Sequence, residues 1–196
     1  DRRRDERLGA GLGEEVAVVA AEARLRAVGA VLQADGAADI VRHVRGLARA
    51  ALDELPDGGS IILDAGTTTV RLAELLPTDR ELTVVTHSIP VASILVSRPN
   101  VTLHLLGGIV RGRTLAAVGE WTKAQIAEVF ADVAFMGTNG ISVERGLTTP
   151  DVTEASVKRA LIDAARRTVV LADHTKFGRE DFARVAPLAD IDTVIT

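Results

Sequence analysis

The chain has 196 residues, of which 47% are hydrophobic, and this is enough apolar material for one sizeable α/β core. Its formal net charge of -4 excludes binding to nucleic acid through the overall charge of the chain. Its lack of cysteine excludes a disulfide framework and thiolate metal sites. No apolar run approaches the roughly 20 residues of a membrane span and no signal peptide is visible, so we expect a cytoplasmic protein with no membrane partner.

Residues 1–38 are predicted to form an N-terminal extension of unassigned role. Acidic residues interleave with the arginines of residues 1–13, which favours a solvated end over a DNA-contacting arm. Residues 14–34 are predicted to form an Ala-rich helix that ends at Asp35-Gly36. Because the first residue is Asp1 and not Met, we expect a fragment of a longer protein.

Residues 39–196 are predicted to form one α/β domain with a layered parallel sheet. After a helix over 38–55, short aliphatic runs alternate with helical stretches. Near-continuous apolar strands of this kind indicate a parallel sheet covered on both faces, with right-handed crossovers. The last strand would need a covering helix, so we expect the domain to continue beyond Thr196. The predicted strands are 61–63, 82–85, 101–106, 133–136, 169–172 and 191–195, and the predicted helices after residue 60 are 68–76, 88–97, 121–130 and 153–166.

The loop after the first predicted strand has the composition of an anion site. Open parallel sheets bind ligands outside the carboxyl ends of their strands. There Gly66 permits a tight turn and close backbone approach, and Thr67, Thr68 and Thr69 stand where a helix begins. Free N–H groups and hydroxyls then converge on one point and can bind phosphate without a lysine. A single threonine that caps a helix N-terminus is common. Three consecutive threonines after a glycine are more than capping requires, and this favours the anion site. The Gly-Lys-Thr element of a P-loop is absent.

The next three strand ends are also polar, with weaker signals. After the second strand, His87 would contact a ligand hydroxyl or be a satisfied surface histidine, and the residues alone favour the latter. Gly107 and Gly108 follow the third strand, and they form either a turn or part of a ligand site that Arg111 and Arg113 approach. The segment Gly137-Thr138-Asn139-Gly140 follows the fourth, where backbone N–H groups would face a ligand or simply form a turn.

Charged residues follow in the last third of the chain. Asp151 and Glu154 have the spacing of a capping box, and Glu154 and Lys158 can pair on a helix surface. Asp173 and Lys176 follow the fifth strand. If both residues lie at the mouth of a cleft that also holds Gly66 to Thr69, the Asp173 carboxylate would accept hydrogen bonds from the hydroxyls of a ligand. The Lys176 ammonium would then face the phosphate of that ligand.

These motifs resemble, in order, the C-terminal domain of DeoR-type transcriptional regulators over residues 39–196. The resemblance implies a fold similar to ribose-5-phosphate isomerase and the CoA-transferases, and a sugar-phosphate effector that relieves repression. It also implies that Gly66 to Thr69 hold the phosphate, that Asp173 and Lys176 contact the effector, and that Glu154 and Lys158 lie near the same cleft. The motifs are Asp64-Ala65-Gly66-Thr67-Thr68, Leu106-Gly107-Gly108, Gly146-Leu147-Thr148-Thr149-Pro150-Asp151 with Glu154 and Val157-Lys158-Arg159, and Ala172-Asp173-His174-Thr175-Lys176-Phe177-Gly178.

Two departures from this family bear on function. The family usually has Asn where His87 stands. Its members carry an N-terminal winged helix-turn-helix, and residues 1–38 show no recognition-helix run of Ser, Thr and Arg between two apolar helices. The resemblance therefore implies DNA binding for a longer parent chain. Palindromic operators favour two-fold symmetric proteins, so we also expect a homo-oligomer.

The leading hypothesis is the effector domain of a bacterial repressor, with no catalytic residue, metal or cofactor. A sugar-phosphate isomerase is the alternative, and a structural oligomerisation domain is a third reading. An isomerase needs a carboxylate base, for which Asp64, Glu154 and Asp173 qualify by type, but segment 137–140 has no acidic pair. The predicted effector-binding residues are Asp64, Gly66, Thr67, Thr68, Thr69, Thr86, His87, Gly107, Gly108, Arg111, Gly137, Asn139, Glu154, Lys158, Asp173 and Lys176; His87, Arg111 and Arg113 are expected to discriminate between sugars.

Overall fold

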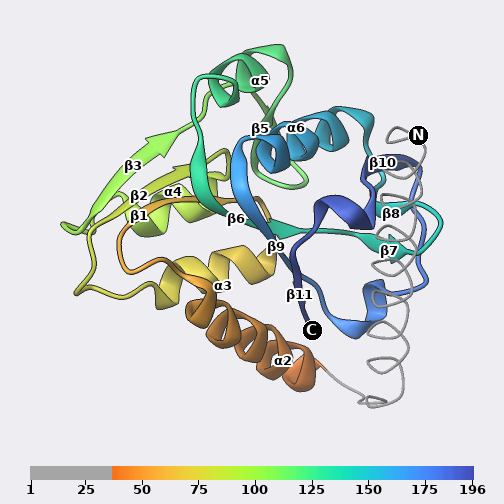
Figure 1. Cartoon of the computed structure of the whole chain (residues 1–196), viewed down its shortest axis with the longest axis horizontal. Coiled ribbons are helices and arrows are strands. Elements are labelled where there is room, and N and C mark those ends of the chain that lie inside the picture. Colours follow the sequence, from red (N-terminus) through yellow and green to blue (C-terminus); the bar gives the residue numbers. More distant parts are fainter. Residues whose placement is uncertain (1–36) are drawn as a thin grey trace, which may run out of the picture.

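The computed structural model describes residues 37–196 (Figure 1). The predicted extension and its helix over 14–34 lie outside the described residues, and the division of the chain at residue 38 stays a prediction. Within residues 37–196, no helix is both long enough and apolar enough to cross a membrane.

A six-stranded parallel sheet forms the centre of the domain, as the aliphatic runs predicted. The chain runs from β1 outward to β2 and β3, and then crosses back to β6 on the other side of β1. The strand order therefore reverses between β1 and β6, which is where open α/β sheets bind ligands. The strand order is β11-β9-β6-β1-β2-β3, with β1 Gly59–Leu63, β2 Leu82–Thr86, β3 Val101–Leu105, β6 Ala131–Gly137, β9 Ala165–Leu171 and β11 Thr193–Ile195.

Helices cover both faces of the sheet (Figure 1). Alternate residues of β1 enter different cores: Ile61 and Leu63 pack with α3 and α4, and Ile62 packs with α5 and α6. Burial on both faces explains why the strands are continuous apolar runs. On one side lie α2 Ala37–Ala50, the 3-10 turn η1 Ala51–Glu54, α3 Thr67–Leu75 and α4 Ile89–Leu95; on the other lie α5 Glu120–Ile126 and α6 Val152–Asp163.

Two small antiparallel sheets were not predicted. Their strands have only three or four residues, too few for a period of two to stand out. Segment 146–149, which leads into the predicted helix over 153–166, is itself a fully buried strand. One sheet is the hairpin of β4 Ile109–Arg111 and β5 Ala116–Val118, and the other contains β7 Gly140–Ser142, β8 Gly146–Thr149 and β10 Ala183–Ala186; the remaining 3-10 turns are η2 His174–Lys176 and η3 Leu188–Asp190.

Gly146, which begins β8, is expected to tolerate no side chain. Its φ of 69° lies in the left-handed region, and a Cβ there would stand 2.1 Å from the carbonyl oxygen of Ala186. We expect Gly146→Ala to lower the free energy of unfolding by about 3 kcal/mol, because strain and overpacking add. Urea denaturation followed by circular dichroism measures this loss. Gly112→Ala, where a Cβ meets nothing within 4 Å, is the control, and an equal loss in both variants would contradict the argument.

Candidate functional site

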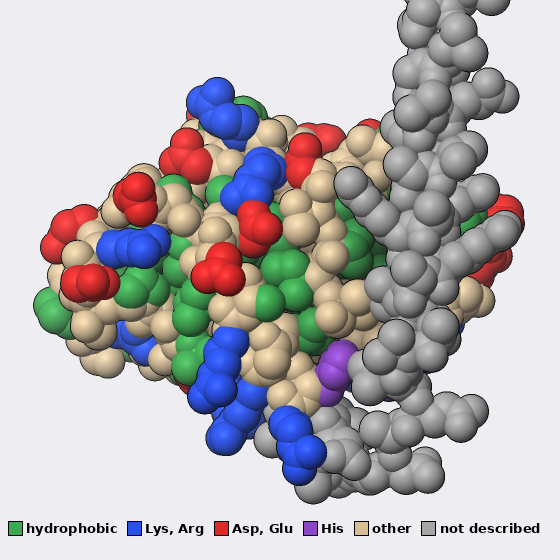
Figure 2. Space-filling view, turned by 60° about the horizontal axis from the view of Figure 1, so that its bottom comes forward, with side chains coloured by type: hydrophobic (Ala, Val, Ile, Leu, Met, Phe, Trp, Pro, Cys, Tyr) green, Lys and Arg blue, Asp and Glu red, His purple; other side chains and the backbone are tan. Residues whose placement is uncertain are grey.

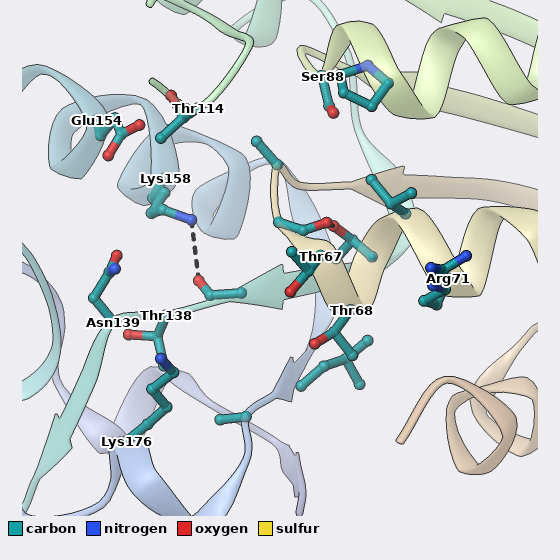
Figure 3. A pocket seen from close by; sticks show the side chains of 18 of the residues that line it. Thr67, Thr68, Arg71, Ser88, Thr114, Thr138, Asn139, Glu154, Lys158 and Lys176 are labelled. Atoms are coloured by element: carbon teal, nitrogen blue, oxygen red, sulfur yellow. Dashed lines mark hydrogen bonds between the residues drawn. The ribbon is translucent and has the colours of Figure 1, made fainter. Parts of the chain in front are cut away.

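A cavity of about 530 Å³ opens at the carboxyl ends of β1, β2, β6 and β9, where the strand order reverses (Figure 3). Helix α6 and the β4–β5 hairpin complete its walls. The cavity brings together residues that the sequence places more than a hundred positions apart, such as Gly66 and Lys176. The predicted residues that line it are Gly66, Thr67, Thr68, Thr69, His87, Gly137, Asn139, Glu154, Lys158, Asp173 and Lys176, together with Arg113.

The N-terminus of α3 forms one wall. Gly66 precedes the helix with extended backbone (φ 162°, ψ 161°), so the turn itself does not require glycine. A Cβ there would make an ordinary contact of 3.5 Å with the Thr69 hydroxyl oxygen. Thr69 is buried and its hydroxyl donates to the carbonyl of Gly66 at 2.9 Å. The first N–H groups of a helix lack intrahelical acceptors. The amides of Thr67 and Thr68, with their two hydroxyls, are therefore the groups available to an anion.

Asp64 lies beneath the cavity and does not line it. Its carboxylate is fully buried, accepts from the amide of Gly137 at 2.9 Å and the ammonium of Lys158, and lies 3.0 Å from Nε2 of His87. Burial alone would raise the pKa of Asp64, but Lys158 and His87 outweigh it and lower the pKa from 3.8 to about 2. Asp64 is thus an anion at neutral pH that joins the ends of β1, β2 and β6 to α6.

Lys158 borders the cavity and lies between it and the Asp64 carboxylate. Besides Asp64, its ammonium donates to the carbonyl of Gly137 at 3.0 Å (dashed line in Figure 3). An ammonium has three donors, so one remains for a ligand. The predicted surface pair of Glu154 with Lys158 is wrong, because both side chains are buried and turn to other partners.

The buried charge on Asp64 should make stability depend on pH. The folded pKa lies below the unfolded value of about 3.9, so the stabilisation is complete above that value and is lost as the pH falls toward 2. The expected loss is about 2 kcal/mol. Asp132 and Asp173 also have lowered pKa values. Comparing urea denaturation of the wild type and Asp64→Asn from pH 5 to pH 2 isolates the contribution of Asp64. If the free energy of unfolding depended on pH in the same way in the wild type and in Asp64→Asn, the proposed contribution of Asp64 would be refuted.

His87 is buried, so the expectation of a surface histidine is wrong. Its Nδ1 donates to the carbonyl of Ala117 at 2.8 Å, because a carbonyl can only accept. Its Nε2 lies 3.0 Å from Asp64 and 3.3 Å from the amide nitrogen of Ala65. The ring therefore joins β2 to the β1 loop and to β5 while one of its sides borders the cavity.

The start of α6 carries a second polar cluster. Asp151 accepts from the amide of Glu154 at 2.9 Å, which confirms the predicted cap. Arg111 pairs with Glu154 at 2.7 Å and with Asp151 at 3.3 Å. Asn139 accepts from the hydroxyl of Thr149 at 3.0 Å. Glu154 and Asn139 thus present fixed polar groups to the cavity, of the kind that bind hydroxyls.

The loop after β9 contributes Asp173 and Lys176. Burial raises the pKa of Asp173, but hydrogen bonds from the amide and hydroxyl of Thr175 outweigh it, and the pKa lies below its usual value. Lys176 is half-buried and, among the described residues, forms no ion pair within 4.0 Å. Both residues border the same cavity as Thr67 and Thr68.

Several predicted residues lie outside the cavity lining and serve the scaffold. The hydroxyl of Thr86 donates to the carbonyl of Leu63 at 2.7 Å. Thr122 donates to the carbonyl of Gly107, and a Cβ on Gly108 would stand 2.1 Å from the Thr122 hydroxyl. The predicted residues outside the lining are Asp64, Thr86, Gly107, Gly108 and Arg111, and their contact with an effector stays a prediction.

Some lining residues were not predicted to be part of the site. Thr114 stands on the unpredicted β4–β5 hairpin, and Arg71 lies one turn inside α3, where no loop signal marks it. Ser88 and Thr138 directly adjoin predicted positions, so the composition of the strand ends could have found them. The sequence therefore indicated the strand-end loops, Arg113 and the α6 residues Glu154 and Lys158, but not Thr114 or Arg71.

On the face that Figure 2 shows, acidic and basic side chains interleave, and several of the basic ones lie together at its lower edge. Over residues 37–196, no group of three or more His, Asp or Glu side chains is arranged to hold a metal ion.

The chain resembles known regulators over most of its length. Residues 42–196 match the family model described as DeoR C terminal sensor domain. The chain is 38% identical over 152 residues to the HTH-type transcriptional regulator GlpR of Haloferax volcanii, covering 78% of this chain and 59% of that protein. It is 31% identical over 150 residues to the Glycerol-3-phosphate regulon repressor of Escherichia coli K12, covering 76% and 60%. The chain thus spans about three fifths of the length of these relatives.

Solved structures share the fold at low identity. Ribose 5-phosphate isomerase A of Methanocaldococcus jannaschii has a TM-score of 0.50 and 17% identity, covering 69% of this chain and 54% of that one. The eIF2B delta subunit of Chaetomium thermophilum has a TM-score of 0.55 and 23% identity, covering 80% and 56%. The predicted likeness to the isomerase fold is confirmed, and the likeness to CoA-transferases stays a prediction.

Proposed function

This chain belongs to the DeoR C-terminal sensor domain family, and we propose on that premise that its cavity is the effector site of a transcriptional repressor and binds a small phosphorylated sugar or polyol. The observation that carries the proposal is the meeting, in one cavity, of the α3 N-terminus with the unpaired Lys176 and with fixed polar groups on α6. The α3 N-terminus and Lys176 suit a phosphate, and the polar groups on α6 suit the hydroxyls of a ligand.

The phosphate would lie before α3. Backbone N–H groups and the helix dipole favour an anion at a helix N-terminus, and the hydroxyls of Thr67 and Thr68 add donors. Lys176 supplies a compensating charge from the loop after β9. Lys158 and Arg71 contribute less charge, because they are paired with Asp64 and Glu74.

The carbon chain of the ligand would extend toward Asn139, Glu154 and the remaining donor of Lys158. Amide, carboxylate and ammonium groups supply both donors and acceptors, as sugar hydroxyls require. The names of the relatives agree with a small phosphorylated ligand, since one of them is named for a glycerol-3-phosphate regulon.

We propose that the domain does not turn the ligand over. A general base works best when its pKa lies near the operating pH. Asp64 is buried, paired and has a pKa of about 2, Asp173 also has a lowered pKa, and Glu154 is paired with Arg111. The likeness to an isomerase extends only to the fold. Relatives are named as regulators, which favours binding over catalysis.

DNA binding is proposed for a helix-turn-helix segment of a longer chain, as the name of the GlpR relative implies for that protein. Self-association is proposed as well, because a two-fold symmetric protein suits a palindromic operator. Light scattering at working concentration tests it, and a monomer mass would count against it.

A thermal-shift screen tests the proposed function. Ribose 5-phosphate, glycerol 3-phosphate and fructose 6-phosphate are compared with ribose, glycerol, fructose and inorganic phosphate. A ligand at about 100 times its dissociation constant adds roughly 2.7 kcal/mol, so a clear rise in melting temperature is expected for a phosphorylated compound alone. If no phosphorylated compound binds, the proposal fails. Conversion of ribose 5-phosphate to a ketose would overturn the non-enzymatic reading.

A further inference from the structure

The tip of the β4–β5 hairpin forms a wall of the cavity that no strand end supplies. Arg113 and Thr114 border the cavity there. Figure 3 places Thr114 beside Glu154, across Lys158 from Lys176. The hairpin tip therefore faces a different part of a bound ligand from the part that Lys176 approaches.

The hairpin is fixed in place. At its base, Arg111 is paired with Glu154 and Asp151. At the other side, the amide of Ala117 donates to the carbonyl of His87 at 2.8 Å, and the amide of Ile89 donates to the carbonyl of Leu115 at 3.0 Å.

The backbone of the tip is also constrained. Leu115 has a φ of 53°, in the left-handed region that is unfavourable for a side chain of this size, and its amide donates to the carbonyl of Arg111 at 2.7 Å. Such a conformation persists only where the surrounding contacts impose it. The tip is thus a rigid wall that holds Arg113 and Thr114 in place before a ligand arrives.

Two polar groups of this wall have no hydrogen-bond or ion-pair partner within the part of the chain that the structure describes. The hydroxyl oxygen of Thr114 is buried and accepts or donates no hydrogen bond, although buried polar groups nearly always have a partner. The guanidinium of Arg113 is exposed and forms no ion pair within 4.0 Å with any residue of the described range 37–196. Among the cavity-lining cations of residues 37–196, Arg71 and Lys158 are paired with carboxylates, whereas Arg113 and Lys176 are not.

The two unpaired cations lie on different walls, and we propose that they bind a ligand with an anionic group at each end. The first group is the phosphate of the proposed function, on which this inference rests. The second, a phosphate or a carboxylate, would accept from Arg113 and from the hydroxyl of Thr114. Guanidinium suits both groups, because its fork of donors matches two oxygens of either. The ligand class is therefore a sugar bisphosphate or a phosphorylated sugar acid.

Calorimetry with matched ligands tests whether the cavity prefers a ligand with two anionic groups. Fructose 6-phosphate, fructose 1,6-bisphosphate and 6-phosphogluconate are titrated into the wild type, Arg113→Gln, Thr114→Val and Arg184→Gln. Arg184 is exposed and does not border the cavity, so its variant controls for the loss of one positive charge. We expect the wild type to bind at least one of the two doubly anionic ligands about tenfold more tightly than fructose 6-phosphate, and comparison of the two identifies the second group.

Arg113→Gln should abolish this preference, because it should weaken binding of the preferred doubly anionic ligand about tenfold more than binding of fructose 6-phosphate. Thr114→Val should reduce the preference several-fold, and Arg184→Gln should retain it. Equal affinity of the wild type for all three ligands, or a preference that survives Arg113→Gln, overturns the inference and leaves the proposed function intact. Failure of all phosphorylated sugars to bind contradicts both.

Discussion

Replacement of Lys158 by Met is expected to lower the free energy of unfolding by about 3–5 kcal/mol. Lys158 is the countercharge of Asp64, which is fully buried, and removing one partner of a buried ion pair leaves the other charge uncompensated. The carbonyl of Gly137 would also lose its side-chain donor. Urea denaturation at pH 7 measures the loss.

The double variant Asp64→Asn/Lys158→Met separates charge from packing. It leaves no buried ion, so it should recover a large part of the stability lost in Lys158→Met. Lys123→Met is the matched control, because Lys123 forms an i,i+3 pair with Glu120 near the surface, where such pairs contribute about 0–1 kcal/mol. The ion-pair argument would not survive if Lys158→Met cost no more than Lys123→Met.

Loss of the Lys176 ammonium is expected to weaken binding of the phosphorylated ligand about 10- to 100-fold. A hydrogen bond to a charged group contributes about 1.5–3 kcal/mol. Among residues 37–196, Lys176 pairs with no carboxylate within 4.0 Å, so its charge is available to the ligand. Thr68→Ala, which removes one neutral hydroxyl, should weaken binding about three- to tenfold. Neither change should alter the fold, since both side chains are only partly buried.

Calorimetry with ribose 5-phosphate and glycerol 3-phosphate measures both effects. Lys123→Ala lies outside the cavity and serves as the control for a lost positive charge. Melting temperatures without ligand separate a loss of affinity from a loss of stability. Unchanged affinity in both Lys176→Ala and Thr68→Ala would show that the phosphate does not lie before α3.

The sequence predicted the sheet and the strand-end loops well because both depend on local patterns. Strands buried on both faces must be apolar throughout, so each appears as a short run that turn residues bound. In a parallel sheet all the carboxyl ends meet at one edge, so polar residues after β1, β6 and β9 had to gather. The approach of Thr67, Thr68, Asp173 and Lys176 to one cavity follows from this topology.

Long-range contacts could not be predicted in the same way. Glu154 and Lys158 have the spacing of a surface pair, but both are buried. Glu154 pairs with Arg111 of β4, and Lys158 pairs with Asp64 at the end of β1. His87 was expected at the surface because nothing in its neighbourhood indicates that β5 covers it. The β4–β5 hairpin was missed because each strand has only three residues.

The position of the Asp64 carboxylate below the cavity has a consequence for engineering. The buried cluster of Asp64, Lys158 and His87 holds the strand ends together. Thr114, Asn139 and Arg113 border the cavity without belonging to this cluster. Substitutions at these three positions can be combined in a library that leaves the buried cluster untouched. A designer of metabolite biosensors could thus retune what the domain detects while retaining the framework that keeps it folded.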